Sequence, residues 1–213
     1  VLRWTRKGDK VYLNVVSYQV YAADSLPVQE AVKNSNFEPI LFGFDVAAYK
    51  KDSITNNVVI NATKLFEEDV KAIGLQDRRR SSYKVSRLDK SRSYIDTIRS
   101  YPKNIEIRHV KTYNAGSPPS NSSTSSLSLM FSNSMILLPE NPMQRRYFDQ
   151  RVGWFTSSQT DYGLEAQKSK TVRYLDRWRL EVKDEDIEKF NLGELVEPKK
   201  QIVYYIDRAT PKK

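Results

Sequence analysis

The chain has 213 residues, of which 39% are hydrophobic and 11% aromatic, and this composition predicts a folded protein with a sizeable core. The formal net charge is +9, and the chain has one histidine. It has no cysteine, which excludes disulfides, thiol nucleophiles and cysteine zinc sites. No apolar run approaches the roughly 20 residues of a membrane-spanning helix, so we expect no span.

The first part of the chain is rich in strand-forming residues. Residues 10–22 combine Val and Tyr in partial alternation, which predicts a strand with one covered face. Residues 38–51 and 56–63 are two β-prone runs joined by the polar stretch from Asp52 to Thr55, a pattern typical of a hairpin. We expect Thr63 to cap a short helix over residues 64–73, which stops at Gly74.

The middle of the chain continues in the same way. Residues 88–101 fit a helix about as well as a strand, and we expect mainly extended structure there. Residues 104–115 alternate at their start, with Ile105, Ile107 and His109 on one side, which predicts a half-buried strand. The Ser- and Pro-rich residues 116–126 then predict a long hairpin connection, after which residues 127–140 resume the sheet.

Fewer elements are expected towards the C-terminal end. Residues 170–182 predict another strand, residues 183–191 one helical turn capped by Asp184, and residues 200–208 a last strand. The sum predicts a mainly β or α+β fold, with antiparallel sheet or sheets and a few short helices.

Residues that could carry catalysis are scarce. His109 stands alone and cannot supply the two ligands of an H-E-x-x-H helix, so we expect a packed or surface imidazole. No G-x-S-x-G, G-x-G-x-x-G or P-loop motif occurs, and the acidic residues 184–188 lack the spacing of an EF-hand loop. The sequence therefore predicts no enzyme, metal site or cofactor in this chain by itself.

Positive charge concentrates between Gln76 and Arg108, where ten Lys and Arg stand against four acidic residues. Tyrosines are interleaved with them, as in grooves that bind polyanions. No nucleic-acid-binding module accompanies the charge, so we expect no nucleic-acid partner, and a solvated, salt-bridged face is the alternative. The predicted polyanion contacts are Arg78, Arg79, Arg80, Lys84 and Arg87.

The segment PMQRRYFDQRVGWFTSSQTDYG, residues 142–163, gathers arginines, aromatic residues, aspartates and glycines. Its arginines offer planar guanidinium groups to the carboxylates, and its first glycine permits close backbone approach. We predict either an internal network that closes the fold or a docking surface, formed by Arg146, Asp149, Arg151, Gly153, Trp154, Asp161 and Tyr162. Five aromatic residues could belong to an interface or to the core, and core is the more common location of such residues; they are Tyr147, Trp154, Phe155, Tyr162 and Trp178.

A series of motifs carries a family resemblance. PENPMQRRYFDQRVGWF, DYG, VRYLDRWRLE and EPKKQIVYYIDRATP, together with RSYI and YPKNIEI, resemble a domain of unknown function. That domain precedes the metzincin-like catalytic domain in a family of bacterial exported zinc-dependent metallopeptidases. The resemblance covers about residues 12–211. It implies that residues 1–200 form a β-rich accessory domain. Residues 201–213 would then be a junction, at the start of the first strand of a downstream peptidase domain.

The resemblance also implies a function. We expect a non-catalytic N-terminal domain that supports folding, latency or substrate access of the downstream catalytic domain, its partner in the same polypeptide. Zinc is expected in that missing domain, and the parent protein is expected to be exported: periplasmic, outer-membrane-associated or extracellular. In a sharper hypothesis, Asp149 occupies the open zinc position. The alternative is an independent polyanion- or glycan-binding module that uses residues 76–108.

Overall fold

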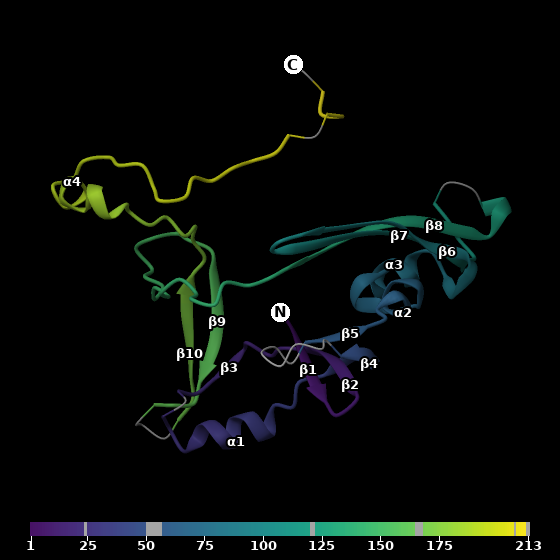
Figure 1. Cartoon of the computed structure of the whole chain (residues 1–213), viewed down its shortest axis with the longest axis horizontal. Coiled ribbons are helices and arrows are strands. Elements are labelled where there is room, and N and C mark those ends of the chain that lie inside the picture. The colour runs from purple at the N-terminus through teal and green to yellow at the C-terminus, as the bar shows by residue number, and fades with distance from the viewer. Residues whose placement is uncertain (24, 50–56, 120–121, 165–167, 207, 212–213) are drawn as a thin grey trace. The chain divides into compact units, whose positions relative to one another are not determined.

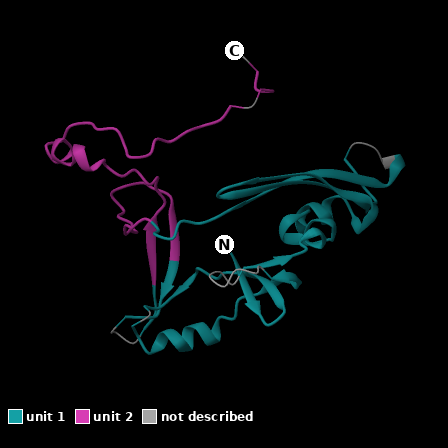
Figure 2. Ribbon diagram, viewed as in Figure 1, with its two compact units in different colours: residues 1–142, 159–170 teal, residues 143–158, 171–213 magenta. Residues whose placement is uncertain are grey.

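The computed structural model of the chain describes residues 1–23, 25–49, 57–119, 122–164, 168–206 and 208–211 (Figure 1). The chain divides into two compact units (Figure 2). Unit 1 comprises Val1–Pro142 and Gln159–Lys170, and unit 2 comprises Met143–Ser158 and Thr171–Lys213. Most strand pairs are antiparallel and the helices are few and short, which confirms the predicted mainly β fold. The boundary at residue 200, between the accessory domain and the junction, stays a prediction.

The first sheet belongs to unit 1 and has the order β1-β2-β4-β5, antiparallel throughout (Figure 1). Its strands are β1 (Leu2–Lys7), β2 (Lys10–Val15), β4 (Ile40–Tyr49) and β5 (Val58–Ile60). Gly8, with a φ of 59°, makes the tight turn between β1 and β2. The hairpin over residues 38–63 is confirmed, although its predicted turn at Asp52–Thr55 lies outside the described residues. Strand β1 was not predicted.

The predicted strand over residues 10–22 is wrong in extent, because the chain changes sheets after Val15. The short strand β3 (Val20–Tyr21) pairs in parallel with β9 (Thr156–Asp161). Here the Gln19 carbonyl accepts from the Thr160 N–H at 2.7 Å, and the Tyr21 carbonyl accepts from the Tyr162 N–H at 3.0 Å. The backbone hydrogen bonds of residues 19–21 are thus directed to a different partner from those of β2.

The second sheet, also in unit 1, is formed by two long hairpins in the order β6-β7-β8. Its strands are β6 (Val85–Tyr101), β7 (Asn104–Ala115) and β8 (Ser126–Ile136). Three register shifts interrupt the pairing of β6 with β7, which explains why the alternation of residues 88–101 was hard to interpret. The extended structure expected there, the half-buried strand over residues 104–115 and the long hairpin connection are confirmed.

Short helices of unit 1 include α1 (Val28–Ser35) and α3 (Asp77–Ser82), neither of which was predicted. The single helix expected over residues 64–73 is wrong, since it is divided into α2 (Thr63–Glu67) and the 3-10 helix η1 (Lys71–Ile73). The backbone turns extended at Glu68, with ψ at 168°. Thr63 is the first residue of α2 rather than its cap, and its N–H donates to the Asn61 side chain at 3.0 Å. The hairpin connection contains η2 (Ser122–Thr124).

Two clusters of buried residues form the core of unit 1. In the first, Leu65 and Phe66 of α2 pack with Leu13 and Phe44 of the first sheet and with Ile107 of the second. Helix α2 therefore joins the two sheets. The second cluster contains Leu75, Tyr113, Ala115 and Leu127. Each buried large apolar side chain contributes about 1.5–3 kcal/mol to the free energy of unfolding.

Unit 2 contains few regular elements. Strand β10 (Lys170–Leu175) stops well short of the predicted Val182, and it belongs to a third sheet of order β10-β9-β3. The 3-10 helix η3 (Asp184–Asp186) leads into α4 (Ile187–Asn191), so the predicted helical turn is present, but Asp184 is the first residue of η3 rather than its cap. The predicted strand over residues 200–208 is wrong for its described part, which pairs with no other strand. A strand is stable only when another strand satisfies its backbone groups.

Candidate interaction surfaces

The segment of residues 142–163 contains a close, local and exposed ion pair. Arg151 and Asp149 form a two-pronged contact, with Arg151 Nε 3.0 Å from Oδ1 and Nη2 2.6 Å from Oδ2 of Asp149. The Arg151 backbone N–H donates to the same Oδ1 at 2.9 Å. These hydrogen bonds lower the pKa of the Asp149 carboxyl and raise the pKa of the Arg151 guanidinium. Both carboxylate oxygens of Asp149 are therefore engaged with Arg151, whereas a zinc ligand needs an oxygen that is free to bind the metal.

The other predicted members of this network do not join that pair. Arg146 is exposed, and its backbone carbonyl accepts from the Leu175 N–H at 2.9 Å. A Cβ built on Gly153 would meet no atom within 4 Å, so the predicted close backbone approach is absent. The Trp154 N–H instead donates to the Val152 carbonyl at 2.9 Å, which makes a tight turn around Gly153.

Asp161 and Tyr162 lie in unit 1 at the end of β9. Asp161 Oδ1 accepts from the Gly163 N–H at 2.8 Å, and Tyr162 lines a pocket of about 640 Å³. A Cβ on Gly163 would lie 2.7 Å from the Leu26 side chain. A larger residue at Gly163 would therefore displace the end of the Leu26 side chain, and the sequence analysis did not single out this position.

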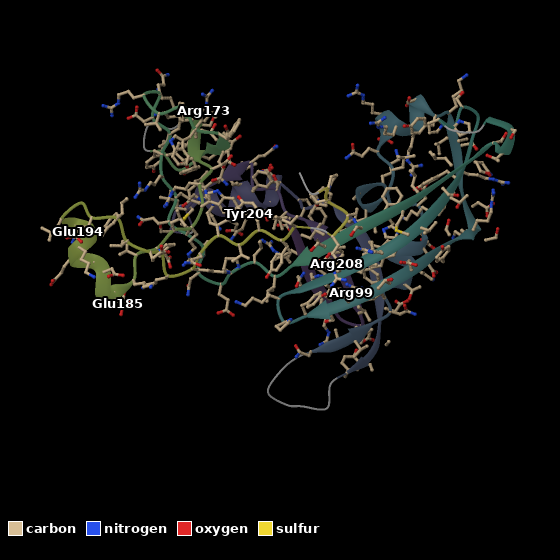
Figure 3. The ribbon with its side chains drawn as sticks, turned by 90° about the horizontal axis from the view of Figure 1, so that it is seen from above. Arg99, Arg173, Glu185, Glu194, Tyr204 and Arg208 are labelled. Atoms are coloured by element: carbon tan, nitrogen blue, oxygen red, sulfur yellow. The ribbon has the colours of Figure 1, made fainter. Side chains whose placement is uncertain are left out.

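The five aromatic residues predicted as interface or core residues are all exposed, so the expectation that they belong to a core is wrong; they are Tyr147, Trp154, Phe155, Tyr162 and Trp178. Phe155 is 90% exposed and Tyr205 is 94% exposed. Figure 3 shows Tyr204 on the long segment that follows α4; its ring meets Trp178 edge-on at 6.5 Å. No described residue of unit 2 is buried. Its exposed large apolar residues are Tyr147, Val152, Trp154, Phe155, Trp178, Leu180, Ile187, Phe190, Leu192, Leu195, Ile202, Val203, Tyr204, Tyr205 and Ile206.

The predicted polyanion contacts are divided between surface and structure. Arg80 is a structural residue, since its guanidinium pairs with Asp69, donates to the Leu75 carbonyl at 2.7 Å and lies over the Tyr113 ring. Arg79 is exposed and donates to the Tyr83 hydroxyl at 3.2 Å. The remaining three, Arg78, Lys84 and Arg87, are exposed.

The inner face of β7 carries polar groups that the sequence analysis did not recognise as buried. His109, predicted as packed or at the surface, is fully buried, and its Nε2 lies 2.6 Å from Asn133 Oδ1. Burial lowers the pKa of His109. Lys111 is also fully buried, its Nζ donates to the Glu68 carbonyl at 2.7 Å, and burial lowers its pKa to about 8. The alternating pattern of residues 104–115 puts His109 and Lys111 on the same face of β7. This pattern was the signal that could have predicted the burial of Lys111.

The Lys111 contact explains why the predicted helix is interrupted. The extended backbone at Glu68 lets its carbonyl accept from the buried ammonium, which would otherwise be costly to desolvate. Next along the chain, Asp69 pairs with Arg80. The first contact holds Glu68 against β7 of the second sheet, and the second ties Asp69 to α3.

Within the described residues, no three His, Asp or Glu side chains gather as a metal site. The helices in the described part of the chain include no apolar segment of membrane-spanning length.

Comparison with family models matches residues 1–183 to a family described as "Domain of unknown function (DUF5117)". Neither the curated proteins nor the solved structures include a match to the chain.

Proposed function

The chain belongs to the DUF5117 family of domains of unknown function, and from that premise we propose that it is a non-catalytic accessory domain that docks onto a partner through unit 2. The partner that we propose is the catalytic domain of a bacterial exported zinc metallopeptidase, downstream in the same polypeptide. The motif series that extends through residues 197–211 supports this choice of partner.

The observation that carries the proposal is the exposure of unit 2. Soluble domains rarely leave a large contiguous apolar surface in water, and surfaces of this kind mark interaction sites. Unit 2 has no buried residue among those described, yet it carries Trp154, Phe155, Trp178 and Tyr205. Aromatic residues of this kind are also enriched at the centres of protein interfaces.

The segment Gln201–Ile206 adds a second argument. It contains Ile202, Val203, Tyr204 and Tyr205, which favour strands, but it forms no strand and is exposed throughout. Such a segment would gain backbone hydrogen bonds and apolar contacts by adding to the sheet of a partner. We propose that it becomes a strand when the peptidase domain is present, and that zinc is held in that domain.

Hydrogen exchange on the full-length parent protein and on residues 1–213 alone tests the proposal. We expect residues 143–158 and 171–206 to gain protection in the full-length protein, while β7 is equally protected in both. Equal exchange of unit 2 in the two proteins would refute docking.

A second candidate function is polyanion binding, and the exposure of Arg78, Arg79, Lys84 and Arg87 favours it. This function predicts binding to a heparin column that weakens steeply with salt and falls when these four residues are changed to Gln. Retention that the quadruple variant shares with the wild type would exclude it.

A further inference from the structure

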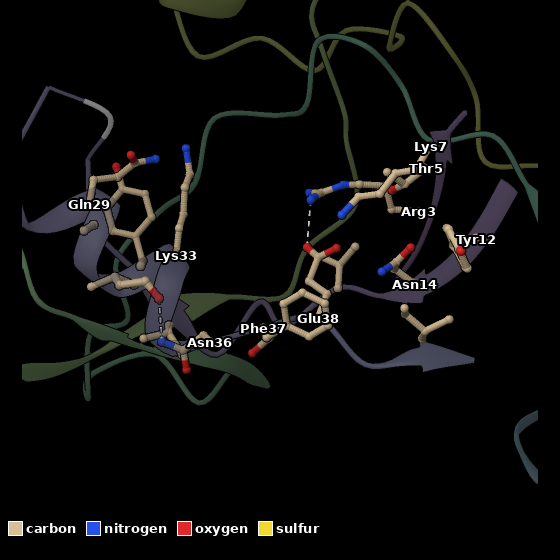
Figure 4. A pocket seen from close by; sticks show the side chains of 17 residues that line it. Arg3, Thr5, Lys7, Tyr12, Asn14, Gln29, Lys33, Asn36, Phe37 and Glu38 are labelled. Atoms are coloured by element: carbon tan, nitrogen blue, oxygen red, sulfur yellow. Dashed lines mark hydrogen bonds and ion pairs between the residues drawn. The ribbon is translucent and has the colours of Figure 1, made fainter. Parts of the chain in front are cut away.

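A second surface, independent of unit 2, is a pocket of about 710 Å³ whose described lining lies entirely within unit 1 (Figure 4). Strands β1 and β2, helix α1 and the segments 16–22 and 36–40 provide its walls. Its volume falls within the roughly 300–1,000 Å³ of small-molecule sites.

The polar wall of the pocket is positively charged. Arg3 and Asn14 are register partners across β1 and β2, so their side chains are neighbours on the same face of the sheet. Arg3 Nη1 donates to Glu38 Oε1 at 2.7 Å, and Figure 4 shows the guanidinium directed towards that carboxylate. Lys7 and Lys33 also line the pocket, whereas Glu38 is the one acid among its described lining residues.

Two polar groups on this wall keep unused hydrogen-bonding capacity. A guanidinium has five N–H donors, and the contact with Glu38 uses one of them. Asn14 is only 9% exposed, and its Oδ1 has no hydrogen-bond partner among the described residues. That oxygen is an acceptor, so water or a donor group can complete it, whereas a carboxylate, which has no donor, cannot.

The remaining walls are apolar and open to the pocket. Tyr21, Phe37 and Ile40 are exposed side chains that line it, with Val20 and Val32 beside them. A ligand that covers these side chains would gain the free energy of removing them from water.

We propose that this pocket binds a small organic carboxylate with an apolar or aromatic body. The guanidinium of Arg3 pairs with the carboxylate, whose two oxygens match its fork of N–H donors, and the apolar body covers Phe37 and Ile40. Glu38 holds Arg3 in the empty pocket and competes with the ligand for it. The cationic lining disfavours cations, and the apolar walls offer no hydrogen bonds to a highly hydrated ion such as sulfate.

Isothermal titration of the full chain with 3-phenylpropionate, hexanoate and decanoate tests the proposal. The control ligand is 3-phenylpropanamide, the uncharged amide of 3-phenylpropionate. We expect at least one carboxylate to bind, and the amide to bind about tenfold more weakly than 3-phenylpropionate because it lacks the charge. Equal affinity of acid and amide, or no heat from any carboxylate at millimolar concentration, would overturn the proposal.

Two variants of the same ion pair give opposite expectations. Arg3→Gln removes the cation and lowers carboxylate affinity about tenfold. Glu38→Gln removes the competing acid, frees Arg3 and raises the affinity. Since both variants break the same ion pair, a merely structural role would make both bind more weakly, which would refute the assignment.

Arg6→Gln is the matched control. Arg6 belongs to the same strand but alternates to the opposite face, where it lies over the Tyr49 ring. The variant should bind the carboxylates as the wild type does. A loss of affinity equal to that of Arg3→Gln would show that general surface charge, not this pocket, attracts the ligands.

Discussion

Unit 1 and unit 2 differ in what they bury. Unit 1 encloses Leu13, Leu65 and Tyr113 completely, whereas unit 2 buries none of its described residues. Both contain strands, aromatic residues and arginines paired with aspartates. The difference teaches that the stability of this chain resides in unit 1, and that the apolar residues of unit 2 are available for an interface.

The largest expected effect comes from the core of unit 1. Leu13→Ala should lower the free energy of unfolding by about 2–5 kcal/mol, because it removes a fully buried side chain and leaves a cavity. Urea unfolding followed by circular dichroism measures this loss. Leu195→Ala in unit 2 is the control, and it should leave the midpoint unchanged because Leu195 is fully exposed. Equal losses in the two variants would break the comparison.

The next effect depends on pH and arises from Lys111. Its pKa is about 8 in the folded chain and near 10.5 in the unfolded chain, so between these pH values the unfolded chain binds more protons. Stability should therefore rise as pH increases through this window, by up to about 2–3 kcal/mol. Lys111→Met should remove this rise, as urea unfolding at several pH values would show. A variant that keeps the wild-type slope would mean that Lys111 does not titrate in the window.

A third test compares two arginine–aspartate pairs of unequal burial. The Arg80 side chain is 13% exposed and also donates to the Leu75 carbonyl, so Arg80→Gln should cost about 1–3 kcal/mol of stability. The Arg151 side chain is 88% exposed, and Arg151→Gln should leave stability unchanged because water screens that pair. Thermal unfolding of both variants measures the contrast, and a larger loss at Arg151 would reverse it.

The smallest effect on stability is expected from the exposed aromatic residues of unit 2. The double variant Phe155→Ser with Tyr205→Ser should melt at the wild-type temperature but bind less of the apolar dye ANS, because it removes exposed apolar surface. Val59→Ser, at an exposed position of β5, serves as the unit 1 control for dye binding. A lower melting temperature in the double variant would show that these two rings belong to a core after all.

The sequence predicted the second sheet of unit 1 well. The alternation of residues 104–115 placed Ile105, Ile107 and His109 on one face; Ile107 and His109 are buried, whereas Ile105 is 42% exposed. The Ser- and Pro-rich connection after Ala115 correctly marked a hairpin. These predictions succeeded because neighbouring residues pair in an antiparallel hairpin, so its pattern is local in sequence.

The candidate site was predicted less well. Of the predicted network, Arg151 and Asp149 pair because they are two residues apart, whereas Arg146 does not contact them. Arg80 was predicted at the surface but pairs with Asp69, eleven residues earlier. Whether Arg80 is exposed or paired depends on how α3 packs, and no local sequence pattern predicts that packing.

By itself, the sequence determined the strand-rich character of the chain and the scarcity of metal-ligating residues, since both follow from composition and alternation. Only the tertiary structure decided which residues are buried: Lys111 lies in the core and Phe155 lies in water, the reverse of what their side chains prefer. The physical reason is that burial depends on which elements pack against one another. Helix α2 covers the inner face of β7 at Ile107, whereas no described residue of unit 2 is covered to the point of burial.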